Sequence, residues 1–166
     1  MLLPYGMRLW DDAAFTRQVT GFNFDNQDMG LEIGYAPGRT SFSVAVSNGT
    51  QGGRDDNTGK QISSVGSVYM KYLIVGGSFA MNESRGIDRM LLGPFASLRL
   101  GPLTLTGEAD WLSESGAKEQ DQFIAYASAN YSLRQSLNFR IAFDFLDRYD
   151  EIEEDERSRV VVGLEG

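Results

Sequence analysis

Apolar and polar residues alternate through most of this chain after residue 28, in runs of about ten. Residues 103–111 alternate leucine, alanine and tryptophan with threonine, glutamate and aspartate, and residues 137–145 do the same with phenylalanine and isoleucine. A strict period of two is typical of β-strands whose two faces meet different surroundings. The sequence therefore predicts an all-β protein.

The connections between the runs predict how the strands follow one another. About nine strands are expected, at residues 28–37, 40–48, 62–71, 73–82, 89–100, 103–112, 120–131, 135–147 and 157–166. Short turns are expected at 37–39, 71–72, 101–102 and 132–134, and long connections at 49–61, 82–88, 113–119 and 148–156. Tight turns at one end of a sheet and long polar loops at the other are typical of an antiparallel transmembrane β-barrel.

The more apolar face of these strands is expected to meet lipid. It carries Leu31, Ile33, Tyr35, Phe42, Val44, Val46, Leu73, Val75, Phe79, Leu103, Leu105, Ala109, Trp111, Leu137, Phe139, Ile141, Phe143 and Phe145. The opposite face, which includes Ala142, is expected to meet water in a lumen. Strand 120–131 stays ambiguous, because Ile124 and Tyr126 share the polar parity.

Charged side chains on the watery face are the candidate pore-lining residues. They are Glu32, Lys71, Arg99, Glu108, Asp110, Arg140 and Asp144. Aromatic residues near the strand ends or outside the strands suit interface girdles, although aromatics are common in any sheet. This second set comprises Tyr5, Trp10, Tyr35, Tyr72, Trp111 and Tyr131.

Residues 1–27 do not alternate and are expected to form an irregular segment or loop before the barrel strands of 28–166. Residues 11–15 suit one turn of helix with an acidic cap. Such a segment either folds into the lumen as a plug or is a loop separated from its preceding strand, and the second interpretation is favoured. The start lacks the pattern of a signal peptide, and the last strand lacks a terminal aromatic residue, so we expect part of a larger barrel.

Composition narrows the function classes. The formal net charge is −8 with scattered basic residues, which gives no footprint for nucleic acid. The chain has no cysteine and no histidine, which removes Ser-His and Cys-His nucleophile pairs and the usual zinc ligand sets. We expect no enzyme activity, and we assign no catalytic, cofactor-binding or metal-binding residues.

Two acidic features of the sequence have side chains that could carry chemistry. Glu108 and Asp110 share a strand face about 7 Å apart at their α-carbons, a pairing that can serve glycoside cleavage, but a charged pore lining is the better interpretation. The acidic run at 147–156 matches no calcium-loop spacing and is read as a solvated loop.

The pair Gly76–Gly77 suits a bulge or bend within a strand.

Several short motifs resemble the phosphate-selective-porin-like barrels of bacteria. They are Leu3-Pro-Tyr-Gly6, Asp28-Met-Gly-Leu-Glu-Ile-Gly34, Val44-Ala-Val-Ser-Asn-Gly49 and Gly101-Pro-Leu-Thr-Leu-Thr-Gly-Glu108. The resemblance covers most of the chain and implies a barrel superfamily. One departure matters: a phosphate channel should cluster arginine and lysine in its lumen, whereas this lining is mixed, so anion selectivity is not supported.

The function expected from the sequence is passive diffusion of small hydrophilic solutes or ions through a porin-like channel in the outer membrane of a Gram-negative bacterium. Outer-membrane lipid and lipopolysaccharide are the expected surroundings, with a homo-oligomer or a periplasmic or extracellular protein partner left open. One alternative is a barrel that sheathes a partner such as an electron-transfer cytochrome or a lipoprotein. Another is a soluble β-sandwich binding module, although irregular connections would suit a sandwich better.

Overall fold

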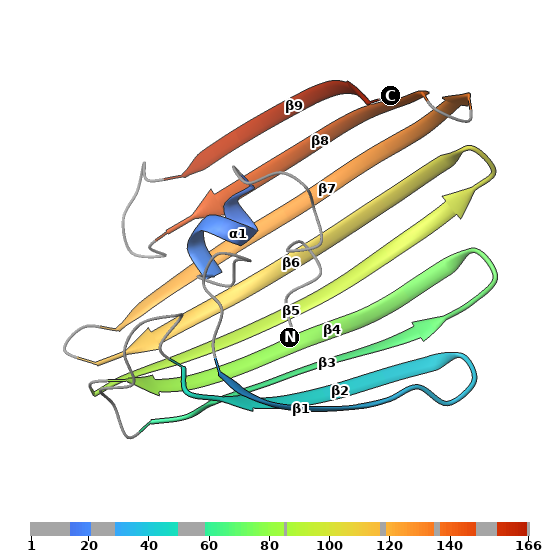
Figure 1. The fold of residues 1–166 in the computed structure, drawn as a ribbon. Helices are drawn as coiled ribbons and strands as arrows, with labels where there is room; N and C mark the ends of the chain where they lie inside the picture. Colours follow the sequence, from blue (N-terminus) through green and yellow to red (C-terminus); the bar gives the residue numbers. More distant parts are fainter. Residues whose placement is uncertain are drawn as a thin grey trace.

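The computed structural model describes residues 14–20, 29–49, 59–84, 86–116, 119–134, 137–148 and 156–165, which form one antiparallel sheet and a short helix (Figure 1). The strands are β1 (Gly30–Tyr35), β2 (Thr40–Ser47), β3 (Gln61–Tyr69), β4 (Leu73–Ser84), β5 (Ile87–Leu100), β6 (Leu103–Ser115), β7 (Gln120–Arg134), β8 (Leu137–Asp147) and β9 (Arg157–Glu165). The helix is α1 (Phe15–Thr20). All nine predicted strands are thereby confirmed, with shifts at their ends.

The strands lie in the sheet in the order in which they occur along the chain, β1 to β9, and every neighbouring pair is antiparallel. β1 and β9 form the two edges, so the described residues make an open sheet rather than a closed one. No second sheet packs against it within these ranges. A meander of this kind needs no crossover connection, because each strand returns beside the strand that precedes it. No helix in the described ranges is long and apolar enough to cross a membrane.

The short turns lie where the sequence predicts them, with one displaced. Gly38 and Gly101 take positive φ values of 57° and 62° in the turns after β1 and β5, a conformation that glycine adopts without steric cost. The predicted turn at 71–72 is also confirmed. The turn predicted at 132–134 is wrong by a few residues, because β7 continues to Arg134 after a register irregularity between Ser132 and Arg134.

The long connection predicted at 82–88 is wrong. β4 continues to Ser84 and β5 begins at Ile87, with Gly86 at a φ of 76° in the turn. The polar residues that suggested a loop are instead paired across the two strands, Asn82 with Arg89 and Glu83 with Asp88. The connection predicted at 113–119 is likewise shorter, because β6 continues to Ser115. The other two long connections are confirmed by the strand ends that flank them.

The sheet has an inner face, which we define as the face that α1 covers, and an outer face on the opposite side. α1 packs against β7 and β8 (Figure 1). On β6, the inner residues Glu108, Asp110 and Leu112 are buried, whereas the outer residue Trp111 is 49% exposed. The same alternation runs through β5, β7 and β8. The predicted assignment of parity to two different faces is therefore confirmed.

Two predictions about individual positions on the inner face need comment. The ambiguity at strand 120–131 resolves in favour of period two, because Ile124 and Tyr126 are both buried on the inner face. The expectation that Ala142 meets water is wrong, since only 1% of it is exposed. It lies on the inner face between its partners Ser128 and Val161, where the middle rows of the sheet are covered.

The glycine pair Gly76–Gly77 makes no bulge. Both residues keep regular pairing with β3 and with β5, so the predicted bulge is wrong. Gly76 is required for a different reason: a Cβ atom there would overlap the Phe95 ring and the Gly66 carbonyl oxygen. The glycine leaves room at β4 for the edge of the buried Phe95 ring.

The helix predicted near residues 11–15 begins at Phe15 in the structure. Residues 11–13 of that prediction, together with Tyr5 and Trp10, lie outside the described residues. The described part, Ala14 to Thr20, lies against the inner face, and Ala14 and Thr16 are fully buried there. Within the described ranges the sheet is open, so the plug and the loop separated from its preceding strand both stay predictions.

Candidate functional site: the polar inner face

A cross-strand row of polar and aromatic side chains crosses the middle of the inner face. Phe95 pairs with Glu108, Glu108 with Tyr126, Tyr126 with Asp144, and Asp144 with Arg159. Directly opposed residues of antiparallel strands share a face and lie about 5 Å apart. The period-two pattern of five separate strands thus brings residues far apart in sequence into one line.

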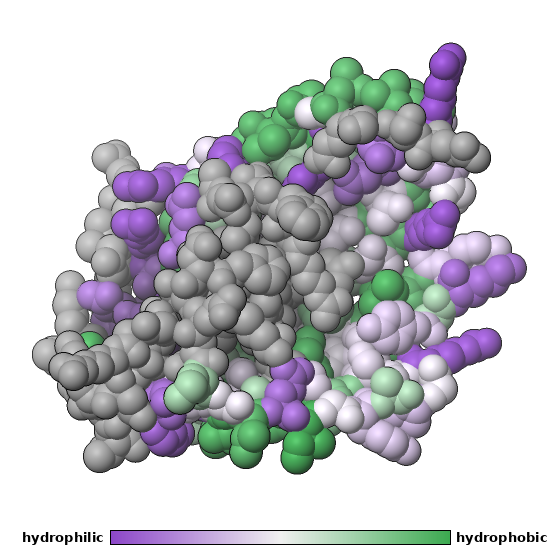
Figure 2. Space-filling view, in the orientation of Figure 1, coloured by the Kyte–Doolittle hydropathy of each residue, from purple (hydrophilic) through white to green (hydrophobic). Residues whose placement is uncertain are grey.

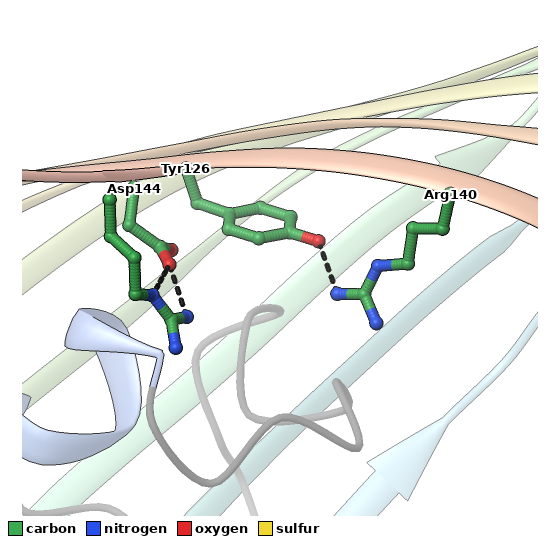
Figure 3. A network of polar contacts seen from close by, with 4 residues as sticks. Tyr126, Arg140 and Asp144 are labelled. Atoms are coloured by element: carbon green, nitrogen blue, oxygen red, sulfur yellow. Dashed lines mark hydrogen bonds and ion pairs between the residues drawn. The ribbon is translucent and has the colours of Figure 1, made fainter. Parts of the chain in front are cut away.

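Asp144 and Arg159 form the strongest polar contact in this row. Both Nε and Nη2 of Arg159 donate to Oδ2 of Asp144, with the Nε bond at 2.8 Å (Figure 3). The Asp144 side chain is 0% exposed and that of Arg159 23%. A carboxylate buried this deeply depends on its charged partner, because an uncompensated charge away from water costs several kcal/mol.

Tyr126 and Arg140 extend the network toward the short turns. Nη2 of Arg140 donates a hydrogen bond of 2.9 Å to the Tyr126 hydroxyl. Figure 3 shows the Tyr126 ring lying along the sheet, with its hydroxyl directed at Arg140 and away from Asp144. The tyrosine therefore separates the two arginine sites of the network, and its own ring is only 2% exposed.

Asp110 differs from its neighbours in having no hydrogen-bond partner. Its residue is 0% exposed, and neither carboxylate oxygen has a partner. A Cβ atom added at Gly93 would overlap Oδ1 of Asp110 and would lie 2.8 Å from the Ser78 hydroxyl. The carboxylate of Asp110 therefore lies over the backbone of Gly93, on the side of β5 that faces Ser78.

Arg89 holds the C-terminal end of α1 at the other end of the inner face. Its Nη2 donates a hydrogen bond of 2.7 Å to the carbonyl oxygen of Val19, and its Nε forms an ion pair of 2.9 Å with Glu114. The Val19 side chain packs against the apolar cluster of Ala80, Leu91 and Leu112. Arg89 thus links the helix to the sheet through its hydrogen bond to Val19, while its ion pair with Glu114 lies within the sheet, between β5 and β6.

Arg159 contacts α1 near its N-terminal end. The centre of its guanidinium lies 5.8 Å from the centroid of the Phe15 ring, within the range of a cation–π interaction. Both ends of the helix are therefore held by arginines that are themselves paired with carboxylates, Glu114 for Arg89 and Asp144 for Arg159. The helix is too short to be stable alone, so these contacts and the Val19 packing keep it in place.

The structure brings four of the seven predicted pore-lining residues together: Glu108, Asp110, Arg140 and Asp144 all lie on the inner face in the middle of β6 and β8. Glu32 lies at an inner position of the edge strand β1 and is exposed. Arg99 is exposed near the turn that ends β5. Lys71 lies in the turn between β3 and β4, with Nζ 4.7 Å from the Tyr72 ring centroid.

Sequence reasoning missed Tyr126, Arg159, Arg89 and Glu114 as members of the site. The alternation in β9 was a sufficient signal for Arg159, because residues 157, 159 and 161 share one parity. Glu114 falls in the predicted loop 113–119, and Arg89 is the first residue of the predicted strand 89–100, next to the predicted loop 82–88. When a strand continues through a run of polar residues, the sequence gives no local signal of where that strand ends.

No known protein family, curated protein or solved structure significantly matches this chain. The resemblance of its motifs to phosphate-selective porins therefore stays a prediction.

Proposed function

We propose that this chain forms part of a porin-like outer-membrane β-barrel through which small hydrophilic solutes or ions diffuse passively. The supporting observation is the distribution of charge on the outer face. Between two levels marked by exposed aromatic residues, the outer positions of the described strands carry no charged side chain. Those positions include Leu105, Ala109, Ala125, Ala127, Ala129, Ile141 and Phe143.

The two aromatic levels lie near opposite ends of the strands. Trp111 pairs with Phe123 near the long loops, with ring centroids 5.2 Å apart, and Phe145 lies 6.3 Å from Phe123. Tyr131, which pairs with Leu103 and Phe139, lies near the short turns. From Trp111 to Leu103 the strand rises about 27 Å at roughly 3.4 Å per residue, or about 21 Å along the axis of a barrel whose strands tilt by about 40°. This height is close to the apolar band of about 25 Å in outer-membrane barrels.

The charged residues of the outer face lie beyond these levels. Glu83, Asp88, Asp121 and Asp147 lie at the loop ends of their strands, and Arg134 lies at the end of β7 beside a short turn. In a membrane these positions meet water or lipid headgroups rather than hydrocarbon. The outer face thus has the vertical order expected in a bilayer, with charged residues beyond the two aromatic levels and uncharged, mostly aliphatic residues between them.

Exposure at the edges of the sheet supports the same proposal. Leu31 and Ile33 on β1 are 83% and 80% exposed, and Val160, Val162 and Leu164 on β9 are 65%, 63% and 67% exposed. Figure 2 shows hydrophobic surface along both edges and hydrophilic residues at the strand ends. A continuous apolar surface of this kind is unusual for a soluble monomer. Contact of the outer face with lipid, together with pairing of β1 and β9 with further strands, would account for this exposed apolar surface.

Refolding the intact protein into lipid vesicles, followed by planar-bilayer recording, tests the proposal. Discrete conductance steps are expected after fusion of the vesicles, with vesicles carrying urea-unfolded protein as the control. A barrel that inserts and resists protease but does not conduct would contradict the channel and favour the sheath. A chain that stays folded and monomeric without detergent or lipid would contradict both and favour a soluble binding module.

A further inference from the structure

Asp110 is a buried carboxylate on the inner face, and neither of its oxygens has a hydrogen-bond partner among the described residues. The other central carboxylate with a described ion pair, Asp144, receives two hydrogen bonds from Arg159. Asp110 is equally buried, yet both of its oxygens lack a hydrogen-bond donor. An ionised carboxylate that is withdrawn from water without a partner destabilises the folded protein by several kcal/mol. A cation bound to the Asp110 carboxylate would therefore stabilise the fold.

The surroundings of Asp110 supply oxygen atoms. Glu108 is two residues away on the same inner face of β6, about 7 Å between α-carbons. On the other side, the Ser78 hydroxyl donates a hydrogen bond of 3.2 Å to the Gly93 carbonyl. Because the hydroxyl proton is used in that hydrogen bond, the lone pairs of the Ser78 oxygen can coordinate a cation. Hard oxygen donors of this kind suit magnesium and calcium.

Gly93 makes this arrangement possible. Any side chain at residue 93 would overlap the Asp110 carboxylate and crowd the Ser78 hydroxyl. The positive side chain nearest along the same cross-strand row is Arg157 on β9, three strands from Asp110. At about 4.8 Å per strand this is roughly 14 Å away, which is too far for an ion pair.

We propose that Asp110 and Glu108, with the Ser78 hydroxyl, bind one divalent cation on the inner face above Gly93. Within the described residues no three acidic side chains gather around one point, so the protein supplies few ligands and water supplies the rest. Magnesium commonly binds in this way, through one or two carboxylates and several waters, whereas calcium prefers a larger set of protein oxygens. Magnesium is therefore the expected ion. The site does not depend on the proposed channel, because an ion can bind there whether or not the barrel conducts.

Isothermal titration calorimetry of the refolded protein with MgCl₂, and separately with CaCl₂, tests the site after chelation and dialysis. One ion is expected to bind per chain, and the bound ion should raise the thermal unfolding midpoint. Asp110→Asn should weaken binding at least about tenfold, which is about 1.4 kcal/mol, and Glu108→Gln should weaken it as well. Gly93→Ala should weaken binding while leaving both carboxylates present.

Asp121→Asn is the matched control, since it removes the same charge from an exposed outer position of β7. Circular dichroism confirms that each variant has refolded. Without divalent ions, Asp110→Asn should be at least as stable as the original protein, because it removes a buried charge. The proposal is overturned if neither ion binds, or if Asp110→Asn and Asp121→Asn bind the ion as tightly as the original protein.

Discussion

The guanidinium of Arg159 donates two hydrogen bonds to one oxygen of Asp144, a carboxylate that is completely buried on the neighbouring strand. The same guanidinium lies over the Phe15 ring of α1. One arginine near the edge of the sheet therefore neutralises a buried charge and holds the helix.

Replacing Arg159 with methionine should destabilise the protein by about 3–5 kcal/mol, because it leaves Asp144 buried without its cation. Urea unfolding in lipid vesicles measures the change. Arg157→Met is the control, since Arg157 lies on the same strand and is exposed, and it should change stability by no more than about 0.5 kcal/mol. Equal effects of the two substitutions would contradict a special role for the Asp144 pair.

Arg89→Met should loosen α1 without unfolding the sheet. The substitution removes the hydrogen bond to the Val19 carbonyl and the ion pair with Glu114. A charged donor is worth about 1.5–3 kcal/mol, so exchange of the Gln18 amide, which donates to the Ala14 carbonyl, should accelerate at least about tenfold. Hydrogen exchange with mass spectrometry gives the measurement, and Arg99→Met at the opposite end of β5 should leave α1 protected. Unchanged exchange in α1 would mean that Val19 packing and the Arg159 contact with Phe15 hold the helix without Arg89.

The two adjacent glycines of β4 should respond differently to alanine. A Cβ atom at residue 76 would overlap the Phe95 ring and the Gly66 carbonyl, whereas one at residue 77 would make only ordinary contacts, at 3.8 Å. Gly76→Ala should therefore cost about 1–3 kcal/mol through overpacking. Gly77→Ala should be neutral or slightly stabilising, because it restricts the unfolded chain. Comparing the two unfolding midpoints under identical conditions decides the matter, and similar midpoints would argue against the close packing of Phe95.

An arginine should be tolerated on one face of the sheet and not on the other, if the outer face meets lipid. Ala127 is an exposed outer residue midway between the aromatic levels, and Thr106 is a half-buried inner residue that pairs with Ser128. Ala127→Arg should cost about 2–4 kcal/mol in a bilayer. Thr106→Arg should cost much less, since its side chain can reach Glu108. Both variants are folded into lipid vesicles for the comparison. An equal loss of stability in the two would contradict contact between the outer face and lipid.

Loop length predicts orientation in the proposed outer membrane. Long loops of such barrels lie outside the cell and short turns lie in the periplasm. An epitope tag inserted at 148–156 should bind antibody on intact cells, whereas a tag at 101–102 should bind only after permeabilisation. Labelling of the second tag on intact cells would reverse the orientation or show that the outer membrane is not the location.

The strands could be predicted from sequence because each depends on neighbours only two residues away. Leu103 to Trp111 alternates so regularly that the inner position of Glu108 and the outer position of Trp111 follow directly. The strand ends could not be predicted equally well. Asn82, Glu83 and Asp88 look like loop residues, but they are strand residues because they pair across a tight hairpin, Asn82 with Arg89 and Glu83 with Asp88.

The inner-face contacts could be predicted only in part. Period two places Glu108, Asp110 and Asp144 on one face, yet burial depends on what covers that face, and the cover comes from residues far earlier in the chain. For this reason the parity of Ala142 predicts contact with water. In the structure the residue is buried on β8, one of the two strands that α1 contacts. The pairing of Arg159 with Asp144 required the register of β8 against β9, which neither strand specifies alone.

The sequential order of β1 to β9 has a consequence for how such a sheet assembles and changes in evolution. Every strand pairs with the strands next to it in the chain, so each pairing closes only a short loop and costs little chain entropy. Hairpins can therefore pair one after another with the edge strand of the growing sheet. Duplication or loss of a single hairpin at an edge would leave every other pairing intact, so the number of strands in the sheet could change by two at a time without altering the register of those that remain.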